Sequence, residues 1–234
     1  MILEPPGLDP TSAPAAAIGE IVHYNVLEGL TRIAMDGAVM PLLAENWGHT
    51  PDGKTYTFRL RKGVTFSDGA TFDAEAVKFS FERAKAPGST NKAKKAVFDN
   101  ISRIDTPDPA TVILVLNNAD GNFLFRMGEN TAVILDPKSA AGAATKPIGT
   151  GPFTFDDWKK GSSVTLAKWD GFRDAKNVDV RGDVYSLGAT LYAMVTGTVP
   201  FENSNPLDCW MKKIRNEFPA PKALNKAVSD RVDW

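Results

Sequence analysis

Hydrophobic and polar residues alternate along residues 55–61, where the sequence reads TYTFRLR. Tyr56, Phe58 and Leu60 fall on one face of an extended chain, while polar residues fall on the other face. This period of two is typical of a half-buried strand. The preceding residues 51–54 read PDGK, which favours a turn leading into that strand. We therefore predict a strand over 55–61 with one face in a hydrophobic core.

A helical period follows Asp73. Val77, Phe81 and Ala84 recur at spacings that place them on one face of a helix. Aspartate is a residue type that caps helix N-termini, because its carboxylate accepts hydrogen bonds from the first free backbone amides. The pattern therefore predicts an amphipathic helix that begins after Asp73 and runs to about Ala86.

Two further signals predict β structure. Residues 111–116 read TVILVL, an apolar and β-branched run typical of a deeply buried strand. Residues 153–166 favour a hairpin that turns at Lys160–Ser162. Residues 149–152 read GTGP, which fits a tight backbone return between domains, with glycine at special φ/ψ values, better than an anion-binding nest. The first three quarters of the chain therefore have an α+β pattern.

The pattern becomes helical after about residue 175. Residues 184–201 carry no charge over 18 positions, close to the ~20 apolar residues that cross a bilayer. Their Gly, Pro, Ser and Thr content, without flanking basic anchors, favours a buried core helix over a membrane span. A second helix is predicted over 206–218, before the prolines of 219–221 end it.

Charge and composition exclude several classes of protein. The 234 residues carry 27 Lys and Arg against 28 Asp and Glu, a net charge of −1 that argues against a nucleic-acid partner. The single cysteine, Cys209, excludes an internal disulfide and any CxxC metal or redox site. His23 and His49 lack converging partners in the sequence, so we expect no catalytic residue, metal site or cofactor.

Residues 7 to about 174 resemble the family 5 extracellular solute-binding proteins of peptide and nickel ABC transporters. The resemblance rests on an ordered series of blocks, each weak when taken alone. The blocks are GLDP at 7–10, VLEGL at 26–30 closing the first helix, PLLAENW at 41–47, DGKTYTFRLRKGVTFSDG at 52–69, FDAEAVKFSFERA at 72–84 and PIGTGPF at 147–153.

This resemblance implies a truncated first lobe and inserted small domain of a type II periplasmic binding protein, over residues 1–176. It implies a non-enzymatic protein that captures a small peptide, a nickel complex or a similar solute for an ABC permease. A periplasmic or other extracytoplasmic location follows from the same resemblance, although the N-terminus lacks the basic and apolar regions of a signal peptide. With the second lobe missing, we expect little affinity.

The resemblance also indicates which residues contact a solute. It points to the segment 11–24 and to a strand near Asn130, which line the first-lobe wall in related proteins. Tyr24 offers an aromatic face and a hydroxyl, while Ser12 and Asn130 offer hydrogen bonds. The alternative for each of the three is an ordinary packing or turn role.

Residues 177–234 resemble the F-to-G helix region of bacterial Ser/Thr protein kinases. DVRGDVYSLGATLY at 179–192 and TGTVPF at 196–201 carry this resemblance. The chain contains none of the glycine-rich, nucleotide-lysine, HRD, DFG or APE motifs, so this short α-helical fragment implies no phosphoryl transfer. Two alternatives to solute binding stay open: a kinase-derived interaction module without catalysis, and a fusion without function.

Overall fold

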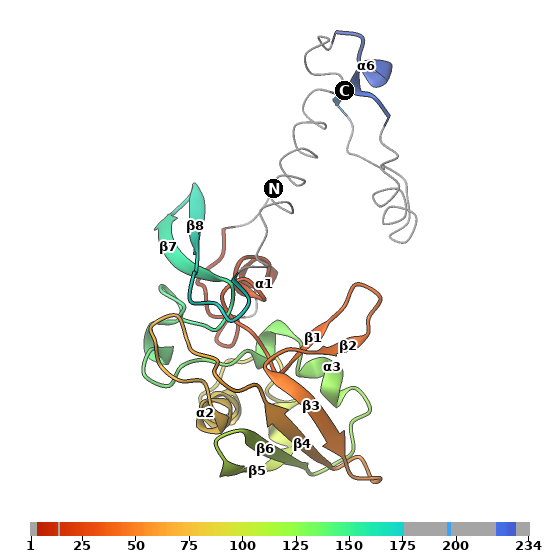
Figure 1. Cartoon of the computed structure of the whole chain (residues 1–234), viewed down its shortest axis with the longest axis vertical. Coiled ribbons are helices and arrows are strands. Elements are labelled where there is room, and N and C mark those ends of the chain that lie inside the picture. The colour runs from red at the N-terminus through yellow and green to blue at the C-terminus, as the bar shows by residue number, and fades with distance from the viewer. Residues whose placement is uncertain (1–3, 14, 176–195, 198–218, 228–234) are drawn as a thin grey trace. The chain divides into compact units, whose positions relative to one another are not determined.

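The computed structural model describes residues 4–13, 15–175, 196–197 and 219–227 (Figure 1). The chain divides into two compact units, residues 1–175 and 176–234. In the described part, no helix is long and apolar enough to cross a membrane. The predicted helices over 184–201 and 206–218, and Cys209, lie outside the described residues.

The centre of the first unit is a four-stranded antiparallel sheet with the order β3-β4-β6-β5 (Figure 1). Its strands are β3 (Ala44–His49), β4 (Thr55–Leu60), β5 (Ile101–Asp108) and β6 (Thr111–Leu116). The predicted strands over 55–61 and 111–116 are thus confirmed as β4 and β6. They pair directly with each other in the middle of the sheet.

The two faces of β4 differ as the alternation predicts. Tyr56, Phe58 and Leu60 are buried, whereas Arg59 is exposed between them. The buried side chains contribute to one hydrophobic cluster with the apolar residues of β6. Burial of these large side chains is the main source of stability in this half of the unit.

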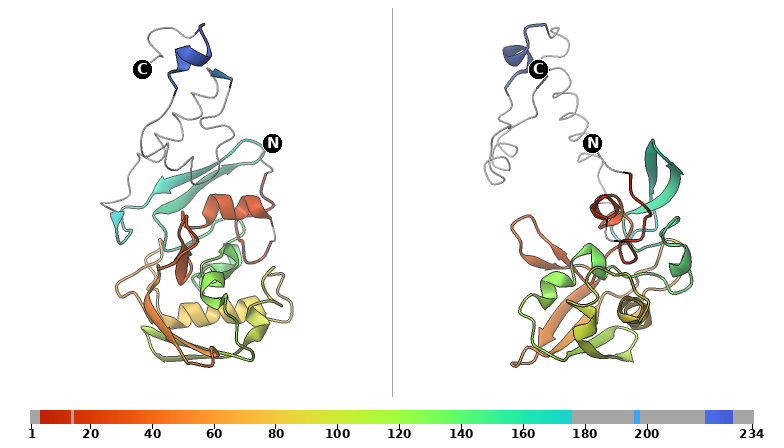
Figure 2. Two further views of the ribbon diagram at one scale, coloured as in Figure 1. Left: turned by 90° about the vertical axis from the view of Figure 1, so that its right-hand side faces the viewer. Right: turned by 180° about the vertical axis from the view of Figure 1, so that it is seen from behind.

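Helix α2 (Ala74–Lys85) covers the buried face of the sheet, as Figures 1 and 2 show from different sides. The Asp73 carboxylate accepts hydrogen bonds from the amides of Glu75 (3.0 Å) and Ala76 (3.1 Å), so the predicted cap is confirmed. The helix ends before Pro87, because a proline disfavours helical geometry in the residue that precedes it.

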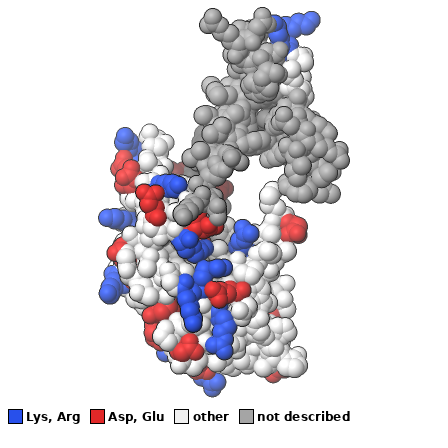
Figure 3. Space-filling view, viewed as in Figure 1, with Lys and Arg blue, Asp and Glu red and all other residues white. Residues whose placement is uncertain are grey.

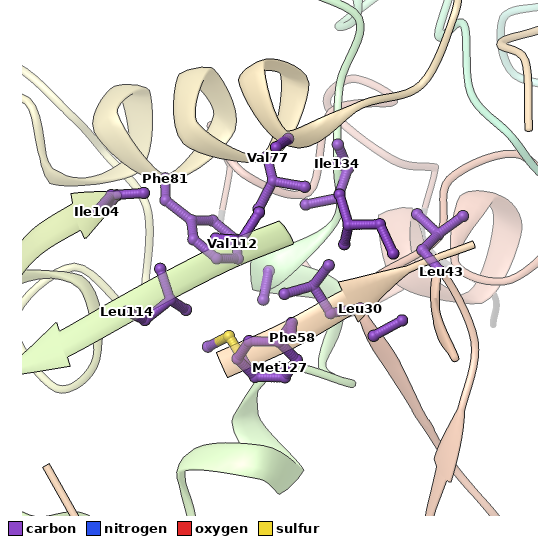
Figure 4. Close-up of a cluster of buried hydrophobic side chains, with 14 of the residues drawn as sticks. Leu30, Leu43, Phe58, Val77, Phe81, Ile104, Val112, Leu114, Met127 and Ile134 are labelled. Atoms are coloured by element: carbon purple, nitrogen blue, oxygen red, sulfur yellow. The ribbon is translucent and has the colours of Figure 1, made fainter. Parts of the chain in front are cut away.

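The apolar side chains of α2 interlock with those of the sheet. Figure 4 shows Val77 and Phe81 pointing from the helix toward Val112 and Leu114 of β6, with Phe58 nearby. All five side chains are at most 1% exposed. The predicted amphipathic face of the helix is therefore the face that closes the core.

A second, smaller cluster surrounds α1 (Ala16–Val22) and the hairpin of β7 (Phe153–Lys159) and β8 (Ser163–Lys168). The hairpin is present where it was predicted, and its turn places Gly161 at a φ of +76°, which glycine adopts without strain. Partly buried apolar side chains of the hairpin pack against the residues around α1. This cluster and the sheet core together form the interior of the first unit.

The remaining elements are short. They are β1 (Thr31–Ile33), β2 (Val39–Pro41), η1 (Phe98–Asn100), α3 (Phe123–Arg126), η2 (Asn130–Ala132), η3 (Ala140–Gly142) and, in the second unit, α6 (Pro221–Leu224). Two expectations are corrected here. The first helix ends at Val22 rather than within 26–30, and Asn130 starts a 3₁₀ turn rather than lying in a strand.

Candidate functional site

A polar groove of about 320 Å³ lies beside the N-terminal segment. Its polar lining is Thr11, Ser12, Arg83, Ser89 and Thr90. Arg83 comes from the last turn of α2, and the two residues 89 and 90 follow that helix. Asp73 and Pro87 set where α2 begins and ends, and the helix end in turn sets where one side of the groove lies.

A buried carboxylate holds the base of this groove together. Asp9 is 2% exposed, and its Oδ2 is 2.8 Å from Nη2 of Arg83. Its other oxygen accepts a hydrogen bond from the Thr11 amide at 2.8 Å, and the Thr11 hydroxyl accepts one from Arg83. Because the carboxylate is paired and hydrogen-bonded, its burial is tolerated and the segment 9–12 is held in one conformation.

Ser12 lies at the edge of the groove, and its hydroxyl oxygen accepts no hydrogen bond from the described residues. Its hydroxyl donates to the Asp9 carbonyl at 3.2 Å, and its own carbonyl accepts a 2.6 Å hydrogen bond from the Thr90 hydroxyl. The Ser12 oxygen therefore retains lone pairs that can accept a hydrogen bond from a ligand. The location of Ser12 is compatible with the predicted contact role.

Tyr24 lies in a different place, and its hydroxyl is already used by the fold. The hydroxyl donates to the Gly128 carbonyl at 2.7 Å and accepts from the Ile33 amide at 2.9 Å. Burial raises the pKa of this hydroxyl, so it stays protonated at neutral pH. Tyr24 also has a φ of +63°, in the left-handed region, directly after the extended residue His23 that ends α1. Only its ring is left for the predicted solute contact.

His23 stacks on Tyr24, with ring centroids 3.8 Å apart. Its Nε2 is buried and lacks a hydrogen-bond partner among the described residues. Burial lowers the pKa of His23 to about 4, because a charged imidazole would lose its hydration there. The ring is therefore neutral at neutral pH.

Asn130 lies against α1. A Cβ built on Gly19 would come within 2.4 Å of its Nδ2, so the helix backbone approaches this amide closely. Asn130 therefore lies near α1. Tyr24 contacts Gly128, which precedes Asn130 by two residues. Ser12 lines the separate groove described above, and Asn130 lines neither that groove nor the cleft described next.

A larger cleft of about 810 Å³ includes Tyr24 in its lining. At its base Glu28 forms two hydrogen bonds of 2.7 Å with Arg173, and Glu28 also accepts one of 2.8 Å from the Thr150 hydroxyl. The Glu28 side chain is 3% exposed and that of Arg173 is 19% exposed. Sequence analysis missed this cluster; a glutamate within the apolar run VLEGL was the available signal.

The predicted backbone return at 149–152 is present beside this cluster. Gly151 donates its amide to the Val26 carbonyl at 3.0 Å, and a Cβ on Gly149 would lie 1.9 Å from that same oxygen. Neither glycine has a positive φ. Close approach of two backbones, rather than an unusual dihedral angle, is therefore the reason for glycine here.

No group of three or more His, Cys, Asp and Glu side chains in the described residues is arranged to hold a metal ion. The two cavities instead offer hydroxyl, carbonyl and guanidinium groups. Such groups are suited to hydrogen-bonding a polar organic molecule.

Comparisons of the sequence and of the fold with known proteins both find bacterial solute-binding proteins. Residues 38–210 match the model of a family described as bacterial extracellular solute-binding proteins, family 5, middle. The glutathione-binding protein GsiB of Salmonella paratyphi A is 32% identical over 169 residues, which cover 70% of this chain and 33% of that protein. The chain thus spans about a third of the length of the curated relatives it matches.

Two solved structures are similar to the chain in fold and sequence. The binding protein AgaA of A. tumefaciens R10, in complex with agropinic acid, has a TM-score of 0.69 and 29% identity over 84% of this chain and 41% of its own. NikZ of Campylobacter jejuni, in complex with Ni(L-His), has a TM-score of 0.65 and 28% identity over 74% of this chain and 35% of its own.

The family match reaches residue 210, so it extends into the segment 177–234 for which a kinase resemblance was noted. The comparisons add nothing in support of that resemblance. The kinase-like interpretation of the tail stays a prediction.

Proposed function

Because the chain belongs to the family 5 bacterial extracellular solute-binding proteins, we propose that residues 4–175 act as one wall of a solute-binding site. The protein captures a small peptide, a nickel complex or a similar polar solute outside the cytoplasm and presents it to an ABC permease. It performs no reaction on that solute. The family match over 38–210 is the observation that carries this proposal.

The wall consists of the polar groove and the surface around α1. Ser12 contributes an acceptor at the groove, Tyr24 contributes its ring, and Asn130 contributes an amide beside α1. Asp9 and Arg83 hold the segment 9–12 in place, so that the wall is preformed before a solute arrives.

A nickel solute would be recognised through its organic ligand. The described residues hold no cluster suited to bind the bare ion, whereas the groove offers hydrogen-bonding groups that suit carboxylate, amine and amide functions. Peptides present the same functional groups. The proposal therefore extends to both solute classes through one set of contacts.

We expect residues 4–175 by themselves to bind such a solute weakly. A dissociation constant of about 1 mM corresponds to about −4 kcal/mol, the free energy of only a few net hydrogen bonds. We therefore expect millimolar rather than micromolar binding of a dipeptide. Calorimetric affinity in the micromolar range or tighter would contradict the incomplete-wall interpretation.

The experiment is a titration of the isotope-labelled full chain with dialanine, glutathione and Ni(L-His), followed by amide chemical shifts. At least one probe should shift the amides near Ser12 and Thr90 in a saturable way. Ser12→Ala should weaken that response, whereas Ser102→Ala, which removes an exposed hydroxyl from β5, should leave it unchanged. Absence of any response, or equal responses in both variants, would contradict the proposal.

A further inference from the structure

The cleft of about 810 Å³ is separate from the groove at Ser12. It lies between the β1–β2 hairpin, the residues that follow β4, and residues 172–174. Figure 3 shows Lys and Arg side chains gathered near the middle of the face seen in Figure 1, with acidic side chains among them. Which charges of the cleft a ligand can use depends on how the charged residues of its lining are paired.

The charges at the base of the cleft cancel each other. Glu28 and Arg173 form a doubly hydrogen-bonded pair, and Thr150 donates a further bond to the same carboxylate. Arg173 also lies over the ring of Phe172, with its guanidinium carbon 4.6 Å from the ring centroid. A ligand therefore meets a neutral floor, and its charge must be balanced by groups on the walls.

Arg61 is the first of those groups. Its Nε donates to the Leu42 carbonyl at 3.1 Å, which fixes the plane of the guanidinium. Its two Nη atoms form no hydrogen bond or ion pair with any residue that the structure describes. A half-buried, oriented guanidinium with free donors is a group that binds a planar carboxylate in two parallel hydrogen bonds.

Arg32 is the second group. It lies on β1 with its side chain exposed, and it forms no ion pair within the described residues. It is near enough to the Tyr24 hydroxyl to act on it electrostatically. Arg32 and Arg61 therefore place two unpaired positive charges in the lining of one cleft.

The other charged residues of the cleft influence how much negative charge a ligand can carry. Lys62 adds a third positive charge, although the carboxylate of Asp108 lies within its electrostatic range. Glu45 adds a negative charge to the lining, and Asp174 adds a carboxylate that already interacts within the protein. The walls thus carry an excess of positive charge, which favours an anion, while the carboxylate of Glu45 works against a dianion such as phosphate.

We propose that this cleft is a binding site for a small solute that carries one carboxylate. Arg61 binds the carboxylate through its free Nη donors, and Arg32 supports it from β1. Glu45 disfavours a more highly charged anion through repulsion. This site goes beyond the groove at Ser12, with which it shares no lining residue.

The test is a titration of the labelled full chain with N-acetylglycine at constant ionic strength. We expect saturable shifts of the amides near Leu42 and Arg61 at millimolar concentration, and no such response to the uncharged analogue N-acetylglycinamide. Arg32→Gln should weaken binding by about tenfold, the effect of removing one charge-assisted contact. Arg61→Gln should weaken it further, but this change also removes the hydrogen bond to Leu42.

Arg32→Gln is therefore the decisive variant, because its exposed side chain has no structural partner among the described residues. The matched control is Arg103→Gln, which removes an exposed arginine from β5 outside the cleft. Equal binding by wild type and Arg32→Gln would overturn the proposal, as would equal binding of the two probes. Tighter binding of inorganic phosphate would overturn the assignment to a carboxylate.

Discussion

The carboxylate of Glu28 and the guanidinium of Arg173 meet in two hydrogen bonds of 2.7 Å, although 145 residues separate them in the chain. The pair closes the first unit, because Glu28 follows α1 and Arg173 precedes residue 175 by only two positions. The backbone just before Glu28 packs against the glycines of 149–151, and the Arg173 side chain also donates to the Thr150 carbonyl at 3.3 Å. This contact fixes the relation between the beginning and the end of the unit.

Removing one partner of this pair should destabilise the unit strongly. Arg173→Ala leaves the Glu28 carboxylate buried without its counter-charge, and we expect a loss of about 3–5 kcal/mol in the free energy of unfolding. Arg103→Ala breaks an exposed ion pair with Asp105 and should cost less than about 1 kcal/mol. Urea denaturation followed by circular dichroism measures both. Similar losses in the two variants would contradict this account.

The backbone return at 149–151 should not tolerate a side chain. Gly149→Ala would place a Cβ 1.9 Å from the Val26 carbonyl oxygen, so the two segments must separate. We expect a loss of about 3 kcal/mol or more in unfolding free energy, as in other overpacked sites. Gly48→Ala is the control, because nothing lies within 4 Å of the Cβ it would add. Thermal denaturation of the two variants distinguishes the outcomes.

The cap of α2 should contribute a smaller, local effect. Asp73→Ala removes two hydrogen bonds to the first turn and should cost about 1 kcal/mol, whereas Asp73→Asn keeps an acceptor and should cost less. Asp36→Ala, in the exposed turn between β1 and β2, serves as the control. Urea midpoints of the three variants check the order. An Asp73→Ala midpoint equal to that of wild type would contradict the contribution of the cap.

Acid should destabilise the unit partly through His23. Its pKa of about 4 lies below the ordinary value of 6.5, so the unfolded chain binds this proton more readily than the folded chain. The stability from the neutral ring is therefore present above about pH 6.5 and falls as the pH drops toward 4. Because the ring is not fully buried, we expect a contribution of about 2 kcal/mol.

The measurement is the difference in unfolding free energy between pH 7 and pH 4.5 for three chains. His23→Phe keeps an aromatic ring stacked on Tyr24 without a titrating group, so its acid destabilisation should be smaller than that of wild type. His49→Phe alters an exposed histidine and should follow wild type. Parallel pH profiles for wild type and His23→Phe would contradict the assignment.

The sequence by itself determined the local elements of the first unit. The alternation around Phe58, the Asp73 cap and the Gly161 turn each act within a few residues, so strand β4, helix α2 and the β7–β8 hairpin could be predicted from neighbouring residues alone. The ordered blocks also identified the family, which the match over 38–210 shows. These features depend on short-range periodicity and on residue type.

Only the tertiary structure decided what the polar residues do. Ser12 and Tyr24 were predicted together, yet Ser12 lines one cavity, while the hydroxyl of Tyr24 is used between Gly128 and Ile33. The Leu42 carbonyl orients the Arg61 guanidinium, and Arg173 balances the charge of the Glu28 carboxylate. Hydrogen bonds and charge compensation link residues far apart in the chain, and no periodicity in the sequence records which pairs meet.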